Sequence, residues 1–200
     1  ASGRQAQQLA ILTRELLSRA SGLLDLAGSH ARMPQQQLHP GVGDVYRDLV
    51  QLEDEFDSVA IDATNHLITV TTSPITLQDL YLGPFEIRLK LYELTRQRRH
   101  LVYSVVATDP QPASSNELVT HPHVRDKELC EGEATAGIRQ ALESGRVCDF
   151  FMLVRSVLEH YNPGSPYVSL EDWEGCACQD CSCTISRDES YYCEGCQQDF

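Results

Sequence analysis

The spacing of apolar residues changes its period along this chain, and that change constrains the fold more than any other feature. Apolar side chains recur every three or four residues, as in an amphipathic helix, over 4–27, 44–56, 134–143 and 146–160. They alternate with polar side chains, as in a half-buried strand, over 59–71, 85–92 and 101–107. Helices followed by successive strands and then by helices predict an α+β fold. Its sheet should be an antiparallel meander flanked by helices.

Two segments carry neither period. Residues 28–43 are rich in Gly, Pro and Gln, which is typical of a linker. Residues 109–131 hold prolines, serines and the run His121-Pro122-His123-Val124. A structureless run of about 20 residues inside a compact domain is uncommon and usually functional, so this long loop is where we expect the site.

Charge and cysteine distribution restrict the partners and the compartment. Lys and Arg number 16 against 29 Asp and Glu, a net charge of −13, which argues against a nucleic-acid partner because phosphate binding needs a basic face. No apolar run approaches the roughly 20 residues that span a bilayer, and no signal peptide is recognisable. We therefore expect a cytoplasmic protein with neither a nucleic-acid nor a membrane partner. One basic stretch, Arg96–Arg99, could face an acidic protein surface.

Six of the eight cysteines fall in the last 25 residues, which favours a metal site in a reducing compartment over a disulfide scaffold. The spacing Cys178-x2-Cys181-x11-Cys193-x2-Cys196 brings two Cys-x-x-Cys pairs together, and four thiolates suit tetrahedral Zn²⁺. With no open position for water, the zinc ion should be structural. Cys176 and Cys183 leave the ligand register open, because either could replace a neighbouring ligand.

The long loop contains a second candidate site. A His-x-His pair occurs in zinc metallopeptidases of the JAMM type, but the downstream Ser-x-x-Asp is missing here and we reject that interpretation. Cys130 is a candidate nucleophile because loops expose reactive groups; as a lone cysteine it could equally be a small apolar filler. Cys148 lies among the aromatic residues of 146–160 and should belong to the core.

Several motifs along residues 44–173 together resemble the ubiquitin-conjugating enzyme (UBC-like) family. They are Leu82-Gly83-Pro84-Phe85, His121-Pro122-His123-Val124, Leu129-Cys130 and Asn162-Pro163-Gly164-Ser165-Pro166-Tyr167-Val168. The chain is most similar to divergent conjugating-enzyme-like proteins from bacterial operons that also encode a ubiquitin-like protein and an activating enzyme. Some of those systems are linked to antiviral defence against phage.

The resemblance implies a ubiquitin-like protein transferase. Cys130 would accept the C-terminus of a ubiquitin-like modifier protein from a ubiquitin-activating-like enzyme, hold it as a thioester and pass it to an amine on a protein target. His123 stands where the family has the Asn of His-Pro-Asn, and its imidazole would donate to the oxyanion or act as a base. His121 completes the candidate catalytic set, with loop anchoring as its main expected role. Weaker candidates are Asn116 as a donor and Asp126, Glu131 and Glu133 as acids near the acceptor.

The predicted organisation is an N-terminal helix (1–30), a linker (31–43), a UBC-like domain (44–173) and a zinc ribbon (174–200). The N-terminal helix either packs on the domain or serves as an arm for a partner. Two alternatives to the transferase remain. One is a catalytically inactive UBC-like adaptor that binds a ubiquitin-like protein, as the missing Asn suggests. The other is an unrelated α+β interaction module with a zinc ribbon.

Overall fold

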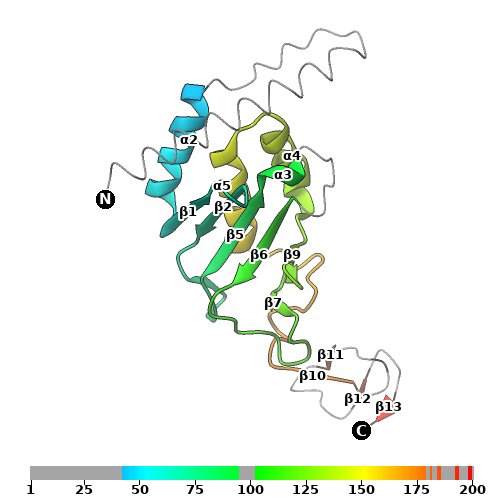
Figure 1. Ribbon diagram of the computed structural model, residues 1–200. Helices are drawn as coiled ribbons and strands as arrows, with labels where there is room; N and C mark the ends of the chain where they lie inside the picture. The colour runs from blue at the N-terminus through cyan, green and yellow to red at the C-terminus, as the bar shows by residue number, and fades with distance from the viewer. Residues whose placement is uncertain are drawn as a thin grey trace, which may run out of the picture.

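The computed structural model describes residues 42–94, 102–178 and 181, together with the backbone of 184–185, 192–193 and 198–199. The predicted helix over 4–27, most of the linker and the basic stretch Arg96–Arg99 lie outside these residues. Within them, the fold is α+β, with a four-stranded antiparallel sheet, smaller two- and three-stranded sheets and helices (Figure 1). None of the described helices is long and apolar enough to cross a membrane.

The helical segments, in chain order, are α2 (Val42–Glu55), α3 (Leu91–Leu94), the 3-10 turn η2 (Gly132–Ala134), α4 (Thr135–Glu143) and α5 (Val147–Glu159). The strands of the body are β1 (Ser58–Asp62), β2 (Leu67–Thr71), β3 (Ile75–Leu77), β4 (Leu80–Gly83), β5 (Phe85–Lys90), β6 (Tyr103–Ala107), β7 (Val119–His121), β8 (Val124–Arg125) and β9 (Glu128–Leu129). Four short strands follow near the C-terminus: β10 (Cys176–Ala177), β11 (Thr184–Ile185), β12 (Tyr192–Cys193) and β13 (Gln198–Asp199).

The central sheet has the order β1-β2-β5-β6 with every pair antiparallel, so the predicted meander is confirmed. The segment expected as one strand over 59–71 is two strands, because the chain turns after Asp62. The Asp62 carboxylate accepts hydrogen bonds from the backbone amides of Thr64 and Asn65 at 2.9 and 3.0 Å, a turn chemistry typical of Asp. The expected strand over 85–92 stops at Lys90, where the short helix α3 begins.

The segment 109–131, expected to be structureless, contains a small three-stranded antiparallel sheet of β7, β8 and β9. That expectation was wrong because strands of two or three residues are too short to show a period of two. The β8–β9 hairpin turns at Asp126 and Lys127, both with positive φ, at 49° and 69°. Hairpin turns of this kind usually carry Asn, Asp or Gly followed by Gly; Lys127 stands in place of that Gly, so the turn was hard to recognise from the sequence.

Helices α2 and α5 pack together, and α5 lies behind the central sheet in the view of Figure 1. For α2, α4 and α5, the predicted boundaries agree with the structure to within two residues, and most of the expected apolar side chains of α2 and α5 are buried. Phe151 of α5 meets Phe56 edge-to-face at 6.2 Å between ring centroids. Cys148 is 3% exposed and belongs to the core, as predicted. Its amide donates to the Asp48 carboxylate of α2 at 3.3 Å.

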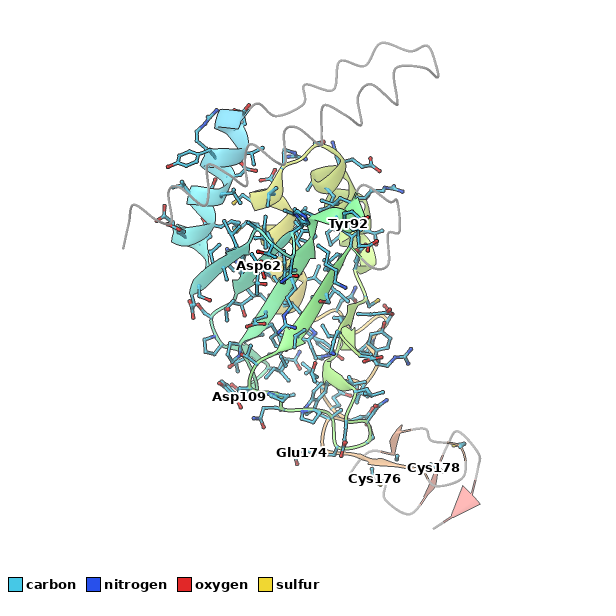
Figure 2. All side chains as sticks on the ribbon, viewed as in Figure 1. Asp62, Tyr92, Asp109, Glu174, Cys176 and Cys178 are labelled. Atoms are coloured by element: carbon cyan, nitrogen blue, oxygen red, sulfur yellow. The ribbon has the colours of Figure 1, made fainter. Side chains whose placement is uncertain are left out.

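Trp173 closes the body of the fold. Its side chain is buried, its indole N–H donates to the Gln111 carbonyl at 3.2 Å, and its own carbonyl accepts from the Ser114 amide at 2.8 Å. The strands β10 to β13 follow this point. Figure 2 shows Cys176 and Cys178 on that C-terminal extension, outside the layers of sheet and helix. Trp173 is therefore the last large side chain that the core encloses before the cysteine-rich tail.

Candidate active site around Cys130

Cys130 directly follows β9, and the β8–β9 hairpin returns the chain to the His-Pro-His run. The Cys130 amide donates to the His123 carbonyl at 2.8 Å, and Val124 pairs with Leu129 just beyond. Although separated along the chain, the backbones of His123 and Cys130 therefore lie side by side, directly before β8 and directly after β9. Cys130 is partly exposed and forms no disulfide, as a nucleophile requires.

The hairpin is held against the rest of the fold on both sides. The Asp126 amide donates to the Leu118 carbonyl at 2.9 Å, and the Lys127 carbonyl accepts from the Val105 amide of β6 at 3.0 Å. Because these bonds come from two different segments, they hold the hairpin, and hence Cys130, at a defined position beside β6, the edge strand of the central sheet.

His121 is fully buried and uses both ring nitrogens within the protein. Its Nε2 lies 2.9 Å from the Leu158 carbonyl of α5, and its Nδ1 accepts from the His123 amide at 3.0 Å. These partners assign the tautomer with hydrogen on Nε2. Burial is the largest effect on the ring and lowers the pKa of His121 to about 4. This geometry agrees with the predicted anchoring role, and it leaves His121 no ring nitrogen for a metal ion.

His123 is 4% exposed, and its Nε2 accepts a hydrogen bond from the Asn162 amide at 3.3 Å. Burial lowers the pKa of His123 below its ordinary value, which favours the neutral ring. With Nε2 already accepting, the proton of the neutral ring resides on Nδ1. As a donor, His123 would act through Nδ1–H, while its Nε2 is already engaged by the turn at Asn162.

The turn after α5 brings together the His-Pro-His motif and the Asn-Pro-Gly-Ser-Pro-Tyr motif, which lie far apart in the sequence. The Tyr167 amide donates to the Pro122 carbonyl at 2.7 Å, and the Arg125 guanidinium lies 4.6 Å from the centre of the Tyr167 ring. The Asn162 side chain accepts from the Gly164 amide at 2.9 Å and shapes the turn itself. The segment after α5 thus packs against the His-Pro-His loop and holds it through hydrogen bonds.

One residue near Cys130 was missed by sequence reasoning. The hydroxyl of Tyr103, on β6, donates to the Glu131 carboxylate at 2.7 Å, and Glu131 is the residue after Cys130. The Tyr103 ring packs edge-to-face on Phe150 of α5 at 5.2 Å. An alternating strand pattern identifies Tyr103 only as a strand residue, so nothing in the sequence signalled this long-range pair.

The weaker candidates differ in their surroundings. Asn116 caps its own turn, because its side-chain oxygen accepts from the Leu118 amide at 3.1 Å. Asp126 and Glu133 are exposed. Glu131 is partly buried, and its carboxylate accepts the hydrogen bond from Tyr103 of β6.

The predicted zinc ligands lie mostly outside the described side chains. Cys178 is 2% exposed, Cys176 is exposed, and no group of three potential ligands occurs among the side chains that are described. The backbone pairing is nevertheless informative. Cys176 of β10 pairs with Ile185 of β11, and Cys193 of β12 pairs with Gln198 of β13.

Each of these hairpins spans one Cys-x-x-Cys pair along the sequence. The first hairpin also holds Cys176 and Cys183, so six thiolates are available in all, and two from each hairpin would fit tetrahedral Zn²⁺.

Comparisons with protein-family models, with curated proteins and with solved structures found no match to this chain. The chemistry of the site therefore has to be argued from its geometry and from the resemblance of its motifs.

Proposed function

We propose that this chain is a UBC-like conjugating enzyme that carries a ubiquitin-like protein as a thioester on Cys130. The supporting observation is that each residue of the His-Pro-His loop is hydrogen-bonded to another segment of the fold. His121 bonds to the end of α5, Pro122 to the segment after it, and the His123 carbonyl to the Cys130 amide. These contacts hold the backbone of Cys130, whose side chain is partly exposed, against the backbone of His123, whose side chain is buried, at the edge of an antiparallel meander.

In the first step, the Cys130 thiolate attacks the activated C-terminal carbonyl of the modifier that the activating enzyme delivers. The carbon–sulfur bond to Cys130 forms as the bond to the activating enzyme's sulfur breaks; that sulfur leaves as a thiolate and takes up from solvent the proton that Cys130 had lost. In the second step, an amine of the protein target displaces Cys130. Both steps place negative charge on the carbonyl oxygen, so a hydrogen-bond donor beside the thiol would lower both barriers.

His123 is the proposed donor. Its neutral ring carries hydrogen on Nδ1 because Nε2 already accepts from Asn162, so it can supply one N–H without changing its charge. This role replaces that of the Asn found in the family. A general-base role for His123 has less support, since the lone pair on Nε2 is engaged by the backbone. His121 acts through the loop as a positioning residue.

A second candidate, the inactive adaptor, follows from the same site. The missing Asn, together with the burial of His123, suits a protein that keeps the scaffold and has lost the chemistry. Such a protein would bind the ubiquitin-like protein without forming a covalent bond to it.

The deciding experiment is a charging assay, read by intact mass, with an activating enzyme and a ubiquitin-like protein from one of the bacterial operons whose conjugating-enzyme-like proteins this chain resembles. We expect an adduct that thiol reductants remove from the wild type and that becomes a reductant-stable ester in Cys130→Ser. Cys148→Ala, which removes the other thiol of the body of the fold and leaves the tail unchanged, is the matched control and should keep the adduct. No adduct, with the activating enzyme itself charged, would overturn the transferase and favour the adaptor.

For the tail, we propose a structural Zn²⁺ held by Cys178, Cys181, Cys193 and Cys196. The ion would supply the folding free energy that the tail's small apolar content does not. The protein would be cytoplasmic, with the modifier, the activating enzyme and a protein target as its partners.

A further inference from the structure

Helix α2 presents a second line of apolar side chains besides the one that faces the core. Tyr46 and Val50, which are 47% and 40% exposed, lie one turn apart on the same face of the helix. Six large apolar side chains are exposed in the described part of the chain, and only these two share an element. Gly43 continues the line toward the start of α2, and an added Cβ there would have no atom within 4 Å. We call Gly43, Tyr46 and Val50 the outer stripe.

The inner side of α2 is already engaged within the fold. Its buried apolar residues belong to the core. The Asp48 carboxylate accepts from the Cys148 amide at 3.3 Å, and the Glu55 carboxylate accepts from Arg155 of α5 at 3.1 Å. The outer stripe is therefore the face of α2 that remains for a further element.

The exposed C-terminal end of α2 is acidic. Glu53 and Asp54 are exposed in its last turn, which holds no basic residue, although the C-terminal end of a helix favours positive charge. Over Val42–Glu55 there are five acids and one arginine, a net charge of −4. An element that covers the outer stripe should therefore be apolar along one face and should carry positive charge near Glu53 and Asp54.

The N-terminal segment of this chain, residues 4–27, has that chemistry. Its apolar residues recur at the spacing of one helix face, at Leu9, Leu12, Leu16, Ala20 and Leu23. The segment also carries three arginines and two acids, a net charge of +1, which is opposite in sign to the charge of α2.

The chain is long enough for this segment to reach the outer stripe. Residues 28–41 connect it to the start of α2, and a flexible linker of that length spans roughly 20 Å on average. Helix α2, with 14 residues, is about 21 Å long at a rise of about 1.5 Å per residue. With residue 27 opposite residue 42, an antiparallel helix brings Arg19 and Arg14 to the level of Val50 and Glu55. Both arginines then lie near the acidic end of α2.

We propose that residues 4–27 form an amphipathic helix that packs antiparallel on the outer stripe of α2 in the same chain. Its leucines contact the outer stripe, and Arg14 and Arg19 lie beside Glu53 and Asp54. Tethering gives the segment an effective concentration in the millimolar range, so a second copy or another protein would have to displace it to reach this face. The proposal does not depend on the transferase chemistry. It assigns the N-terminal helix to packing on the domain instead of serving as an arm for a partner.

Photo-crosslinking of the full chain tests the contact. Tyr46 or Val50 is replaced by p-benzoyl-phenylalanine, the protein is irradiated, and the cross-linked peptides are identified by mass after digestion with trypsin. Trypsin releases residues 5–14, 15–19 and 20–32 as separate peptides because arginines end each of them. We expect a cross-link within one chain from position 46 to 20–32 and from position 50 to 15–19.

The same replacement at Tyr81 is the control for this measurement. Tyr81 is similarly exposed, and its hydroxyl lies 3.5 Å from the Asp109 carboxylate. Figure 2 shows Asp109 at the end of the body away from α2. A probe at Tyr81 should therefore form no cross-link to the N-terminal peptides.

Two double variants test whether the leucines make the contact. Leu12→Asp with Leu16→Asp should lower the yield of both cross-links by about ten-fold or more, because two apolar contacts are replaced by charges. Gln7→Asp with Ser18→Asp adds the same charge on the opposite face of the helix and should leave the yield near the wild-type value.

Each other outcome would overturn the proposal or a named part of it. Cross-links that join two chains into a covalent dimer would overturn packing within one chain in favour of a second copy. The proposal would also fail if neither α2 probe reached the N-terminal peptides, if the Tyr81 probe reached them equally well, or if both double variants lost the cross-links equally. A reversed order of the two peptides would overturn the antiparallel direction.

Discussion

The body of the fold and its C-terminal tail differ sharply in composition. The body buries apolar side chains from α2, the central sheet and α5 in one continuous cluster. The tail has only four large apolar side chains after Trp173 (Ile185, Tyr191, Tyr192 and Phe200) but six cysteines. Apolar burial stabilises a domain through many small contributions, whereas a structural metal contributes through a few strong bonds. If the tail holds the proposed Zn²⁺, the same chain uses two sources of stability that respond to different treatments.

Metal removal should give the largest difference between the two regions. If the tail is held by Zn²⁺, a chelator removes its fold altogether and leaves the body intact. We expect one zinc ion per chain by elemental analysis and, after chelation, rapid proteolysis beyond residue 174. The single tryptophan, Trp173, should keep a buried emission spectrum. Cooperative loss of the body together with the tail would break the comparison.

Truncation of Phe151 tests whether apolar packing stabilises the body independently of the tail. Phe151 is fully buried and meets Phe56 and Phe150, and a large-to-Ala change in such a place costs about 3 to 5 kcal/mol. Urea unfolding of Phe151→Ala should show this loss with the zinc content unchanged. Tyr46→Ala, at a side chain 47% exposed on α2, should cost far less; an equal loss would argue against this core.

Acid should weaken the body through His121. Burial lowers its pKa from 6.5 to about 4, so between those values the unfolded chain binds a proton that the folded chain does not. The free energy of unfolding should have its full value, as far as His121 is concerned, above about pH 6.5. It should fall by about 3 kcal/mol as the pH drops to about 4.

Urea titrations at a series of pH values would measure this slope, and His121→Asn should reduce it. His160→Gln, at an exposed histidine, is the control and should leave the slope as it is. A slope that is the same in all three proteins would exclude His121 as its source.

Gly83 offers a smaller and local effect. It has a φ of +78°, and a Cβ there would lie 2.6 Å from the Asp109 carbonyl, so Gly83→Ala should cost about 2 kcal/mol. Gly43 of α2 has no atom within 4 Å of an added Cβ, and Gly43→Ala should be neutral or slightly stabilising. Thermal unfolding of the two variants would compare them directly, and equal effects would contradict the close approach at Gly83.

Much of the body could be predicted from the sequence because its signals are local. Apolar periodicity predicted α2, α4 and α5 nearly to their ends, and alternation located the strands of the meander. The errors occur where a local signal is short or absent. The break at Asp62 depends on side-chain hydrogen bonds to the next few amides, and the three strands between 119 and 129 are too short to show a period.

For the candidate site too, local features could be predicted from the sequence and long-range contacts could not. The sequence alone singled out His121, His123 and Cys130 by residue type and spacing, and it placed Cys148 in the core. Only the tertiary structure decided that His123 lies beside Cys130, that His121 is tied to Leu158, and that Tyr103 holds Glu131. Each of those contacts joins segments that are distant in sequence or turned back by a hairpin. Their partners are chosen by the packing of the whole sheet against α5, which no local pattern encodes.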